Sequence, residues 1–201
     1  EIKEYQLADY IIVPSEFAKK TFIDRGIDKK KVIKIPYGVN INHFNNERSK
    51  RNSDELFRIV YVGNCSVRKG IIYLLKAFSE LNLNNSELLI VGNIEKELLP
   101  LISKYLNNKK VKYLKSQKQV NLKNYYNISN VFITCSIEEG LSMVQLQAMA
   151  CGLPVICTRN SGGEEIIKHN YDGFILPIRD ITELKNKITY LYENAKICEQ
   201  M

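Results

Sequence analysis

The chain has 201 residues, of which 45% are apolar and 25% are charged, and its formal net charge is +7. This balance predicts a folded protein with a sizeable core, and no apolar run approaches the ~20 residues that cross a bilayer. The positive charge is explained first by solvated basic faces and second by contact with an anionic membrane surface; an anionic small ligand is a further explanation. Nucleic acid ranks last, because no aromatic-interleaved RNA-binding motif accompanies the lysines.

Short elements and a turn are predicted for the first part of the chain. In order, they are a helical tail, a strand over 8–15, a helix over 16–25, a strand over 32–36 and a turn over 36–40. Ser15 is placed to cap the second helix, and Gly26 to end it. The polar stretch 45–55 has no periodicity, which indicates a linker or a surface loop.

From residue 57 onward, predicted strands and helices alternate at a near-constant interval. The strands are 57–63, 87–92, 111–114, 131–135, 155–158 and 174–177; the helices are 71–81, 94–106, 122–127, 143–151 and 181–194, with another opening at 161–163. Alternation without hairpin signals predicts an α/β fold with a doubly wound, Rossmann-like parallel sheet. Ligands bind at the carboxyl ends of such strands. The residues expected there are Gly63, Gly92, Ser116, Glu139 and the Gly162–Gly163 loop.

A polar loop with two adjacent cations follows the strand at 57–63. Arg68 and Lys69 stand just before Gly70, and cations beside glycines at the carboxyl end of a strand suit a diphosphate. Gly63 would let such a ligand approach the backbone. The loop is not a Walker motif, because the GxxxxGK[ST] spacing is absent. On this segment alone, a solvated Arg-Lys pair is the simpler interpretation.

The segment 134–163 reads as a strand end, an acidic loop, a short helix, a Gly-Pro turn, a strand and a glycine loop. Ser142 and Gln145 have the spacing of a capping box, so we expect free helix N–H groups beside the strand end, where they favour an anion or a hydroxyl. Glu139 and Gln147 are separated by ~12 Å of helix and could contact two parts of an extended ligand. An ordinary strand–helix–strand unit with a solvated acidic loop explains the spacing equally well.

Cysteines and histidines give no sign of a disulfide framework or a metal site. The five cysteines include no CxxC pair and lie mostly in apolar context, which favours reduced thiols and predicts a cytoplasmic protein. The two histidines, His43 and His169, have no zinc-motif spacing. We therefore expect no metal and no cofactor. No signal peptide is visible and the chain does not begin with Met, so we expect a piece of a longer protein.

Residues 139–156 resemble the signature of retaining glycosyltransferases with the GT-B fold, in the large family called family 4. The family pattern is Glu, seven residues, Glu, then Ala-Met-Ala-Cys-Gly and Pro-Val-Ile. The matching residues here are Glu139, Gly140, the run Gln147-Ala148-Met149-Ala150-Cys151-Gly152 and the run Pro154-Val155-Ile156. Gln147 stands where the family commonly has its second glutamate. Upstream, Lys69-Gly70 matches the family's Lys-Gly, whereas Asn64 replaces its arginine.

The run ADYIIVPSEFAKK, followed by KVIKIPYGVN, resembles the join between the two halves of a GT-B enzyme. The resemblance implies that residues 1–40 are the tail of an N-terminal acceptor domain and the interdomain connection. Residues 41–201 would form the nucleotide-sugar donor-binding Rossmann-like domain, which is the C-terminal half of such an enzyme. The body of the acceptor domain would be absent.

By this resemblance the whole protein transfers a sugar from a UDP- or GDP-linked donor to a glycan or lipid-linked acceptor, with retention, in polysaccharide biosynthesis. Lys69 would stabilise the leaving diphosphate, and Glu139 would accept hydrogen bonds from the sugar hydroxyls. Gln147 would meet the ribose. The other expected donor-binding residues are Gly63, Arg68, Gly140, Leu141, Ser142 and Met143. Front-face attack could give retention, and the adjacent Glu138 and Glu139 do not form the separated carboxylate pair of a hydrolase.

Two alternatives stay open. The first is a non-catalytic nucleotide-sugar-binding module, which Asn64 and Gln147 slightly favour. The second is a related GT-B protein such as a nucleotide-sugar epimerase or a phosphorylase, against which the setting of Lys69 and Glu139 argues. We expect residues 1–201 alone to bind a nucleotide without turnover, because the acceptor groups would lie on the absent domain. The basic faces also fit loose contact with the inner face of a membrane.

Overall fold

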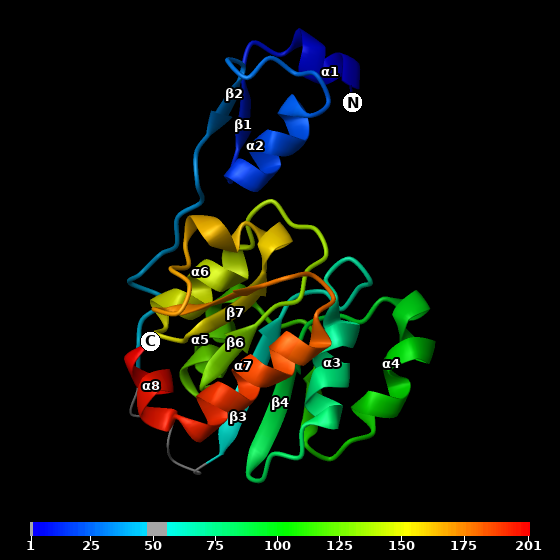
Figure 1. Ribbon diagram of the computed structural model, residues 1–201, viewed down its shortest axis with the longest axis vertical. Coiled ribbons are helices and arrows are strands. Elements are labelled where there is room, and N and C mark those ends of the chain that lie inside the picture. Colours follow the sequence, from blue (N-terminus) through cyan, green and yellow to red (C-terminus); the bar gives the residue numbers. More distant parts are fainter. Residues whose placement is uncertain (1, 48–55) are drawn as a thin grey trace.

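The computed structural model describes residues 2–47 and 56–201, which form two units with separate parallel sheets (Figure 1). A smaller unit at the N-terminus holds a two-stranded sheet, and a larger body holds a six-stranded sheet. An extended segment of chain that begins after residue 34 connects the two units (Figure 1). Most of the polar stretch predicted at 45–55 lies outside the described residues.

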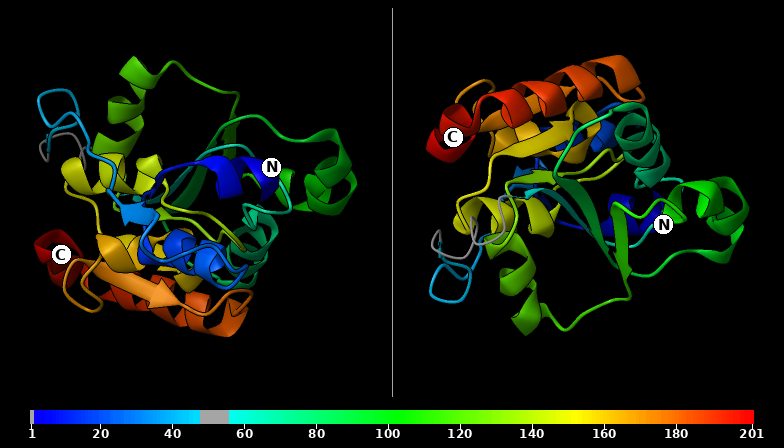
Figure 2. Two further views of the ribbon diagram at one scale, coloured as in Figure 1. Left: turned by 90° about the horizontal axis from the view of Figure 1, so that it is seen from above. Right: turned by 90° about the horizontal axis from the view of Figure 1, so that it is seen from below.

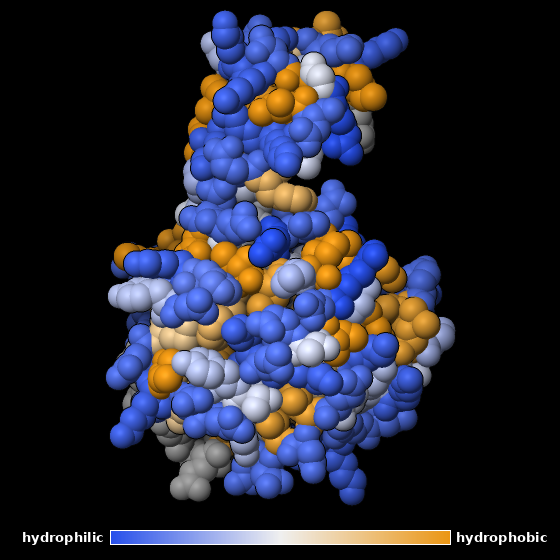
Figure 3. All heavy atoms as spheres, viewed as in Figure 1, coloured by the Kyte–Doolittle hydropathy of each residue, from blue (hydrophilic) through white to orange (hydrophobic). Residues whose placement is uncertain are grey.

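The smaller unit consists of α1 (Ile2–Leu7), β1 (Ile11–Val13), α2 (Glu16–Ile23) and β2 (Val32–Lys34). Ser15 caps α2 as predicted, because its Oγ accepts the Ala18 N–H at 3.0 Å. The inner side chains Val13 and Val32 are buried, whereas Ile12 on the outer face is 67% exposed. Apolar residues are accordingly visible at the surface of this upper unit (Figure 3).

The larger sheet has the strand order β5-β4-β3-β6-β7-β8, and every pair of neighbours is parallel. Its strands are β3 (Phe57–Val62), β4 (Ser86–Val91), β5 (Val111–Leu114), β6 (Val131–Ile133), β7 (Val155–Thr158) and β8 (Gly173–Leu176). The chain winds outward from β3 to the β5 edge and then returns to place β6 on the other side of β3. The winding direction therefore reverses between β3 and β6, where doubly wound sheets bind ligands.

Helices cover both faces of this sheet (Figure 2). On one face lie α3 (Ile71–Glu80), the 3-10 turn η2 (Lys96–Leu98), α4 (Leu99–Leu106) and α7 (Ile181–Glu193); on the other lie α5 (Gln119–Asn127) and α6 (Met143–Ala150); α8 (Ala195–Gln200) follows α7. Neighbouring residues of β3 serve opposite cores, since Ile59 packs toward α3 and Val60 toward α5 and α6. Burial on both faces explains the continuous apolar runs of the central strands.

Two local expectations were wrong, and one helix was missed. The capping box does not form: Ser142 makes no side-chain cap, and Gln145 Nε2 donates to Ser161 O at 3.3 Å, because Gln145 is fully buried. In place of a helix at 161–163 there are two 3-10 turns, η3 (Arg159–Ser161) and η4 (Gly163–Glu165), interrupted by Gly162 at φ +68°. The short helix α8 was not predicted.

The described helices and the cysteines can be compared with the expectations from composition. No helix within the described residues is both long and apolar enough to cross a membrane. All five cysteines are free and buried, as expected for thiols that fill a core.

Candidate functional site

An open cleft of about 860 Å³ lies beyond the carboxyl ends of β3 and β6, where the winding reverses. One wall is the loop after β3, with Gly63, Asn64 and the run 66–69, and the opposite wall is Glu139 with the run 141–144. A volume of this size is within the range of small-molecule sites. The cleft therefore lies at the sheet edge that the sequence predicted.

Two glycines allow the loop after β3 to pack closely against its neighbours. Gly70 is the N-cap of α3 at φ +63°, and a Cβ there would lie 2.0 Å from Cys135 O, at the end of β6. Gly92 ends β4, and a Cβ there would lie 1.9 Å from Gly63 O. Since no side chain fits at either position, the loop after β3 lies directly against its neighbours, and its residue Lys69 lines the cleft.

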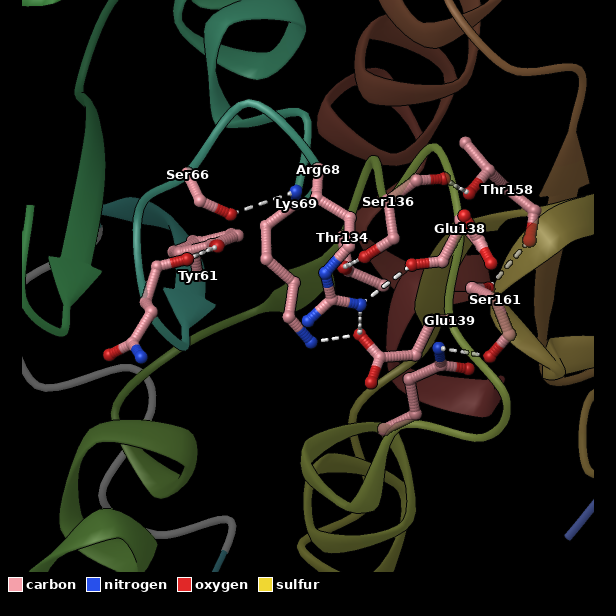
Figure 4. Close-up of polar contacts among 12 residues, drawn as sticks. Tyr61, Ser66, Arg68, Lys69, Thr134, Ser136, Glu138, Glu139, Thr158 and Ser161 are labelled. Carbon is pink, nitrogen blue, oxygen red and sulfur yellow. Dashed lines mark hydrogen bonds and ion pairs between the residues drawn. The ribbon is translucent and has the colours of Figure 1, made fainter. Parts of the chain in front are cut away.

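Lys69 and Glu139, which are 70 positions apart, meet across the cleft (Figure 4). Lys69 Nζ forms an ion pair and hydrogen bond with Glu139 Oε2, and each side chain is 18% exposed. Arg68 Nη1 lies 3.7 Å from the same carboxylate oxygen and donates to Glu138 O at 2.9 Å. Both cations thus point toward Glu139, as Figure 4 shows.

The ammonium of Lys69 titrates closer to neutrality than an ordinary lysine. Burial, followed by the charge of Arg68, lowers the pKa of Lys69 from 10.5 to about 8. The Glu139 carboxylate acts in the opposite direction, because contact with an anion favours the protonated amine. At pH 7 the side chain is mostly charged and can bind an anion that replaces Glu139.

The wall after β6 presents backbone donors. Within the described residues, the N–H groups of Leu141, Ser142 and Met143 donate to no acceptor, as expected for the first turn of a helix, and all three residues line the cleft at the start of α6. Cations on one wall and helix N–H groups on the other make the cleft complementary to an extended anion.

Two predicted donor-binding residues lie outside the cleft. Gln147 is 3% exposed, and its Oε1 accepts the Tyr126 hydroxyl at 3.1 Å. Gly140 faces the smaller unit, where its carbonyl oxygen accepts from Ser15. The structure brings Gly63, Arg68, Lys69, Glu139 and the run 141–143 to one cleft, and the role of each in binding a donor stays a prediction.

Other lining residues were not singled out from the sequence. Tyr37 and Glu95 line the main cleft, and Gln117 lines an adjoining pocket of about 90 Å³ with the expected Ser116 and Gly92. Each follows a predicted strand end or turn, so its position along the chain could have indicated it. Nothing in the residue types distinguished these three from other polar loop residues.

A metal site is not evident in the parts of the chain that the structure describes. No group of three His, Cys, Asp or Glu side chains is placed to hold an ion there. His169 Nδ1 instead accepts the Ile175 N–H at 3.0 Å, and His43 packs edge-on against Phe44.

Comparison with known sequences identifies relatives that are described as glycosyltransferases. The family model described as "Glycosyl transferases group 1" matches residues 43–201. The uncharacterized glycosyltransferase MJ1069 of Methanocaldococcus jannaschii is 27% identical over 96% of this chain and 52% of that protein. The amylovoran biosynthesis glycosyltransferase AmsD of Erwinia amylovora is 30% identical over 86% of this chain and 49% of that protein. The chain spans about half the length of these relatives.

Solved structures give the same fold. Sucrose-phosphate synthase from Thermosynechococcus elongatus matches with a TM-score of 0.85 and 25% identity, over 96% of this chain and 51% of that one. Anabaena Alr3699/HepE in complex with UDP and glucose matches with a TM-score of 0.85 and 21% identity, over 98% and 56%. The expected α/β architecture with a doubly wound parallel sheet is confirmed.

Proposed function

Because this chain belongs to the glycosyl transferases group 1 family, we propose that it is the donor-binding portion of a retaining glycosyltransferase of family 4 type. The observation that carries the proposal is the meeting of Lys69, Arg68 and Glu139 over a cleft that also presents free helix N–H groups. A nucleotide-diphosphate sugar has a diphosphate for the cations and hydroxyls for the carboxylate. HepE, whose structure holds UDP and glucose, makes UDP-linked donors the first choice, with GDP-linked donors next.

In the proposed mechanism, the donor diphosphate replaces Glu139 as the partner of Lys69. The bond between the anomeric carbon and the β-phosphate oxygen breaks, and its electrons go to the departing diphosphate. Lys69 and the N–H groups of the run 141–143 stabilise this charge, which is electrostatic catalysis. Arg68 supplies the second cation, since Asn64 cannot. Glu139, released from Lys69, accepts hydrogen bonds from the sugar hydroxyls.

Retention of configuration is proposed to follow front-face attack. The acceptor hydroxyl approaches the anomeric carbon on the side from which the diphosphate departs, and its proton goes to the departing phosphate oxygen. The protein then has to orient both substrates and exclude water, and no protein nucleophile is required.

The nucleoside is proposed to lie toward the small pocket that adjoins the cleft at Gly63 and Asn64. Gln147 lines neither pocket, and its Oε1 already accepts from Tyr126, so its proposed contact with the ribose goes through the amide nitrogen and requires the side chain to turn toward the cleft. An amide can serve here because it donates as well as accepts. We expect the wild-type chain to bind its donor; calorimetry in which only the Gln147→Glu variant binds would contradict this role.

A thermal-shift panel of UDP-, GDP- and ADP-sugars tests the proposal on the chain itself. At about 100 times its dissociation constant, a bound donor adds about 2.7 kcal/mol to stability, so a clear rise in Tm is expected with one nucleotide. At the same donor concentration the Lys69→Met variant should show a clearly smaller rise. If no nucleotide sugar shifts the Tm of the wild type, the proposed function is wrong.

We further propose that residues 1–40 end an acceptor domain that other parts of the protein complete. The chain alone then binds a donor but does not transfer its sugar. The full-length protein binds the donor and transfers the sugar to a glycan or lipid-linked acceptor. Transfer and donor hydrolysis assays on the full-length protein separate this enzyme from a non-catalytic binding module. Robust transfer by residues 1–201 alone would refute the division.

Contact with the inner, cytoplasmic face of a membrane is proposed from one charged region. Residues 98–123 contain no Asp or Glu and seven lysines: Lys104, Lys109, Lys110, Lys112, Lys115, Lys118 and Lys123. Within the same stretch of sequence, Leu101 on α4 is 56% and Val120 on α5 is 57% exposed. Lysines with exposed apolar side chains suit anionic lipid.

Co-sedimentation with phosphatidylglycerol vesicles tests this contact. Neutralising Lys112, Lys115 and Lys118 to Gln should abolish binding, and neutralising Lys29 and Lys30 in the smaller unit should not. Equal binding to phosphatidylcholine vesicles, or none to either, would contradict it.

A further inference from the structure

The loop that carries Glu139 is held from outside the cleft by the smaller unit. Ser15 Oγ donates to Gly140 O at 2.5 Å while accepting the Ala18 N–H at 3.0 Å, and Ser15 is fully buried. A Cβ on Gly140 would lie 3.4 Å from Pro14 and 3.8 Å from Ala18. The end of β1 and the start of α2 therefore pack directly on the residue that follows Glu139. Figure 1 shows this end of α2 facing the larger body.

The turn at 160–165 holds the same loop from the other side. The Glu139 N–H donates to Asn160 O at 2.7 Å. Gly162 approaches so closely that a Cβ there would lie 2.2 Å from Gly140 O. The backbone around Glu139 is thus enclosed between this turn and the start of α2.

Glu165 joins the two enclosing segments to each other. Its Oε1 accepts the Glu16 N–H, the first of α2, at 2.7 Å, and its Oε2 accepts from Lys34 Nζ at 2.9 Å. Lys34 Nζ also lies 3.0 Å from Glu16 Oε1. The Glu165 side chain is only 12% exposed, and a carboxylate at a helix N-terminus also interacts favourably with the helix dipole.

The protonation of Glu165 fits this arrangement. Burial opposes its ionisation, but the hydrogen bonds from the Glu16 N–H and from Lys34 outweigh burial and lower the pKa of Glu165. The same contact raises the pKa of Lys34. Both groups are charged near pH 7, so the ion pair is present under ordinary conditions.

From these contacts we propose that Ser15 and Glu165 are positioning residues for Glu139. Glu165 fixes the start of α2 against the turn at 160–165, and Ser15 then holds the Gly140 carbonyl, so the place of the Glu139 carboxylate depends on the docked smaller unit. The inference rests on the proposed function in one respect only, the assignment of the donor hexose to Glu139.

Hydrogen exchange tests the positioning without any ligand. In Glu165→Ala, the amide of Glu139 should exchange roughly tenfold faster, because the loop loses one of its supports, while amides of β4 stay unchanged. The matched control is Glu164→Ala, since Glu164 is exposed and makes no hydrogen bond or ion pair within the described residues. Glu165→Gln keeps an acceptor for the Glu16 N–H and should give an intermediate rate. If Glu165→Ala exchanges at Glu139 no faster than the wild type or than Glu164→Ala, the inference is overturned.

Ligand affinity separates positioning from general destabilisation. Calorimetry should show about fivefold weaker binding of the nucleotide sugar to Glu165→Ala. The affinity for the matching nucleoside diphosphate should not fall, because the diphosphate competes with Glu139 for Lys69 and only the sugar is bound by Glu139. An equal loss for both ligands would indicate a merely structural role. Wild-type chain that binds neither ligand would refute the proposed function, and the exchange rates would still decide the inference about Glu165.

Discussion

The two sheets of this protein are built from similar strands but are covered differently. The six-stranded sheet has helices on both faces, and Ile59, Val60 and Ile90 in its central strands are at most 1% exposed. In the two-stranded sheet, α2 covers one face only, and Ile12 and Ile33 on the other are 67% and 39% exposed. Parallel sheets are normally covered on both faces. The larger sheet is therefore buried on both faces, whereas the smaller sheet keeps one apolar face exposed.

The largest expected effect comes from removing a core side chain of the larger sheet. Ile90→Ala deletes three carbon atoms from a position that is 1% exposed, and such changes cost about 2–5 kcal/mol of unfolding free energy. Chemical denaturation, with far-UV circular dichroism to confirm a folded starting state, measures the change. A loss below about 1 kcal/mol would mean that the site collapses around the deletion and that this core is less tightly packed than the structure shows.

The second effect concerns the proposed donor site, whose residues Lys69 and Glu139 both lie on the larger body. Lys69→Met keeps the length of the side chain and removes the charge, so we expect about 10- to 100-fold weaker binding of the donor diphosphate, the equivalent of one charged hydrogen bond. Calorimetry with the nucleotide chosen by the thermal-shift panel measures it. Lys196→Met on α8 is the matched control, since Lys196 is exposed and distant in sequence from every cleft residue. Equal affinity of both variants would remove Lys69 from the site.

A smaller effect should follow from pH alone. Since the pKa of Lys69 is lowered to about 8, its cation is present below that pH and is lost above it. Diphosphate affinity should therefore fall as pH rises, approaching tenfold between pH 7 and pH 9 if only the ammonium form binds. In Lys69→Met this fall should be absent. A wild-type affinity that stays constant through pH 9 would show either that the diphosphate does not contact the Lys69 ammonium or that the pKa of Lys69 in the free chain lies above 9, the direction that contact with Glu139 favours.

The same contrast explains what the sequence could predict. The strands of the larger body were found because burial on both faces leaves continuous apolar runs. Lys69 and Glu139 follow two such strands. Because ligands bind at the carboxyl ends of parallel strands, the sequence alone predicted both residues at the same edge of the sheet. Their direct contact and the depressed pKa depend on Gly70 and on burial, which spacing does not reveal.

Other contacts were beyond the sequence for identifiable reasons. The Tyr126 hydroxyl donates a hydrogen bond to Gln147 Oε1, and this pairing depends on how α5 packs against α6. Glu165 accepts from Glu16, 149 positions away, and depends on how the two units dock. The predicted capping box failed because Gln145 is buried toward Ser161. Local spacing specifies a helix start, but it does not specify where a long polar side chain finds its partner.

The smallest expected effect lies on the uncovered face of the smaller sheet. Ile12→Thr keeps a β-branched residue in β1 and changes only an exposed position, so the unfolding free energy should change by less than about 0.5 kcal/mol. Denaturation beside Ile90→Ala measures the contrast between the two sheets, and Val13→Thr, on the covered face of the same strand, should cost more because Val13 is 3% exposed. If Ile12→Thr instead destabilises as much as Val13→Thr, Ile12 is buried in solution. A loss that grows with protein concentration would then indicate a second copy as the covering surface, since association stabilises by mass action.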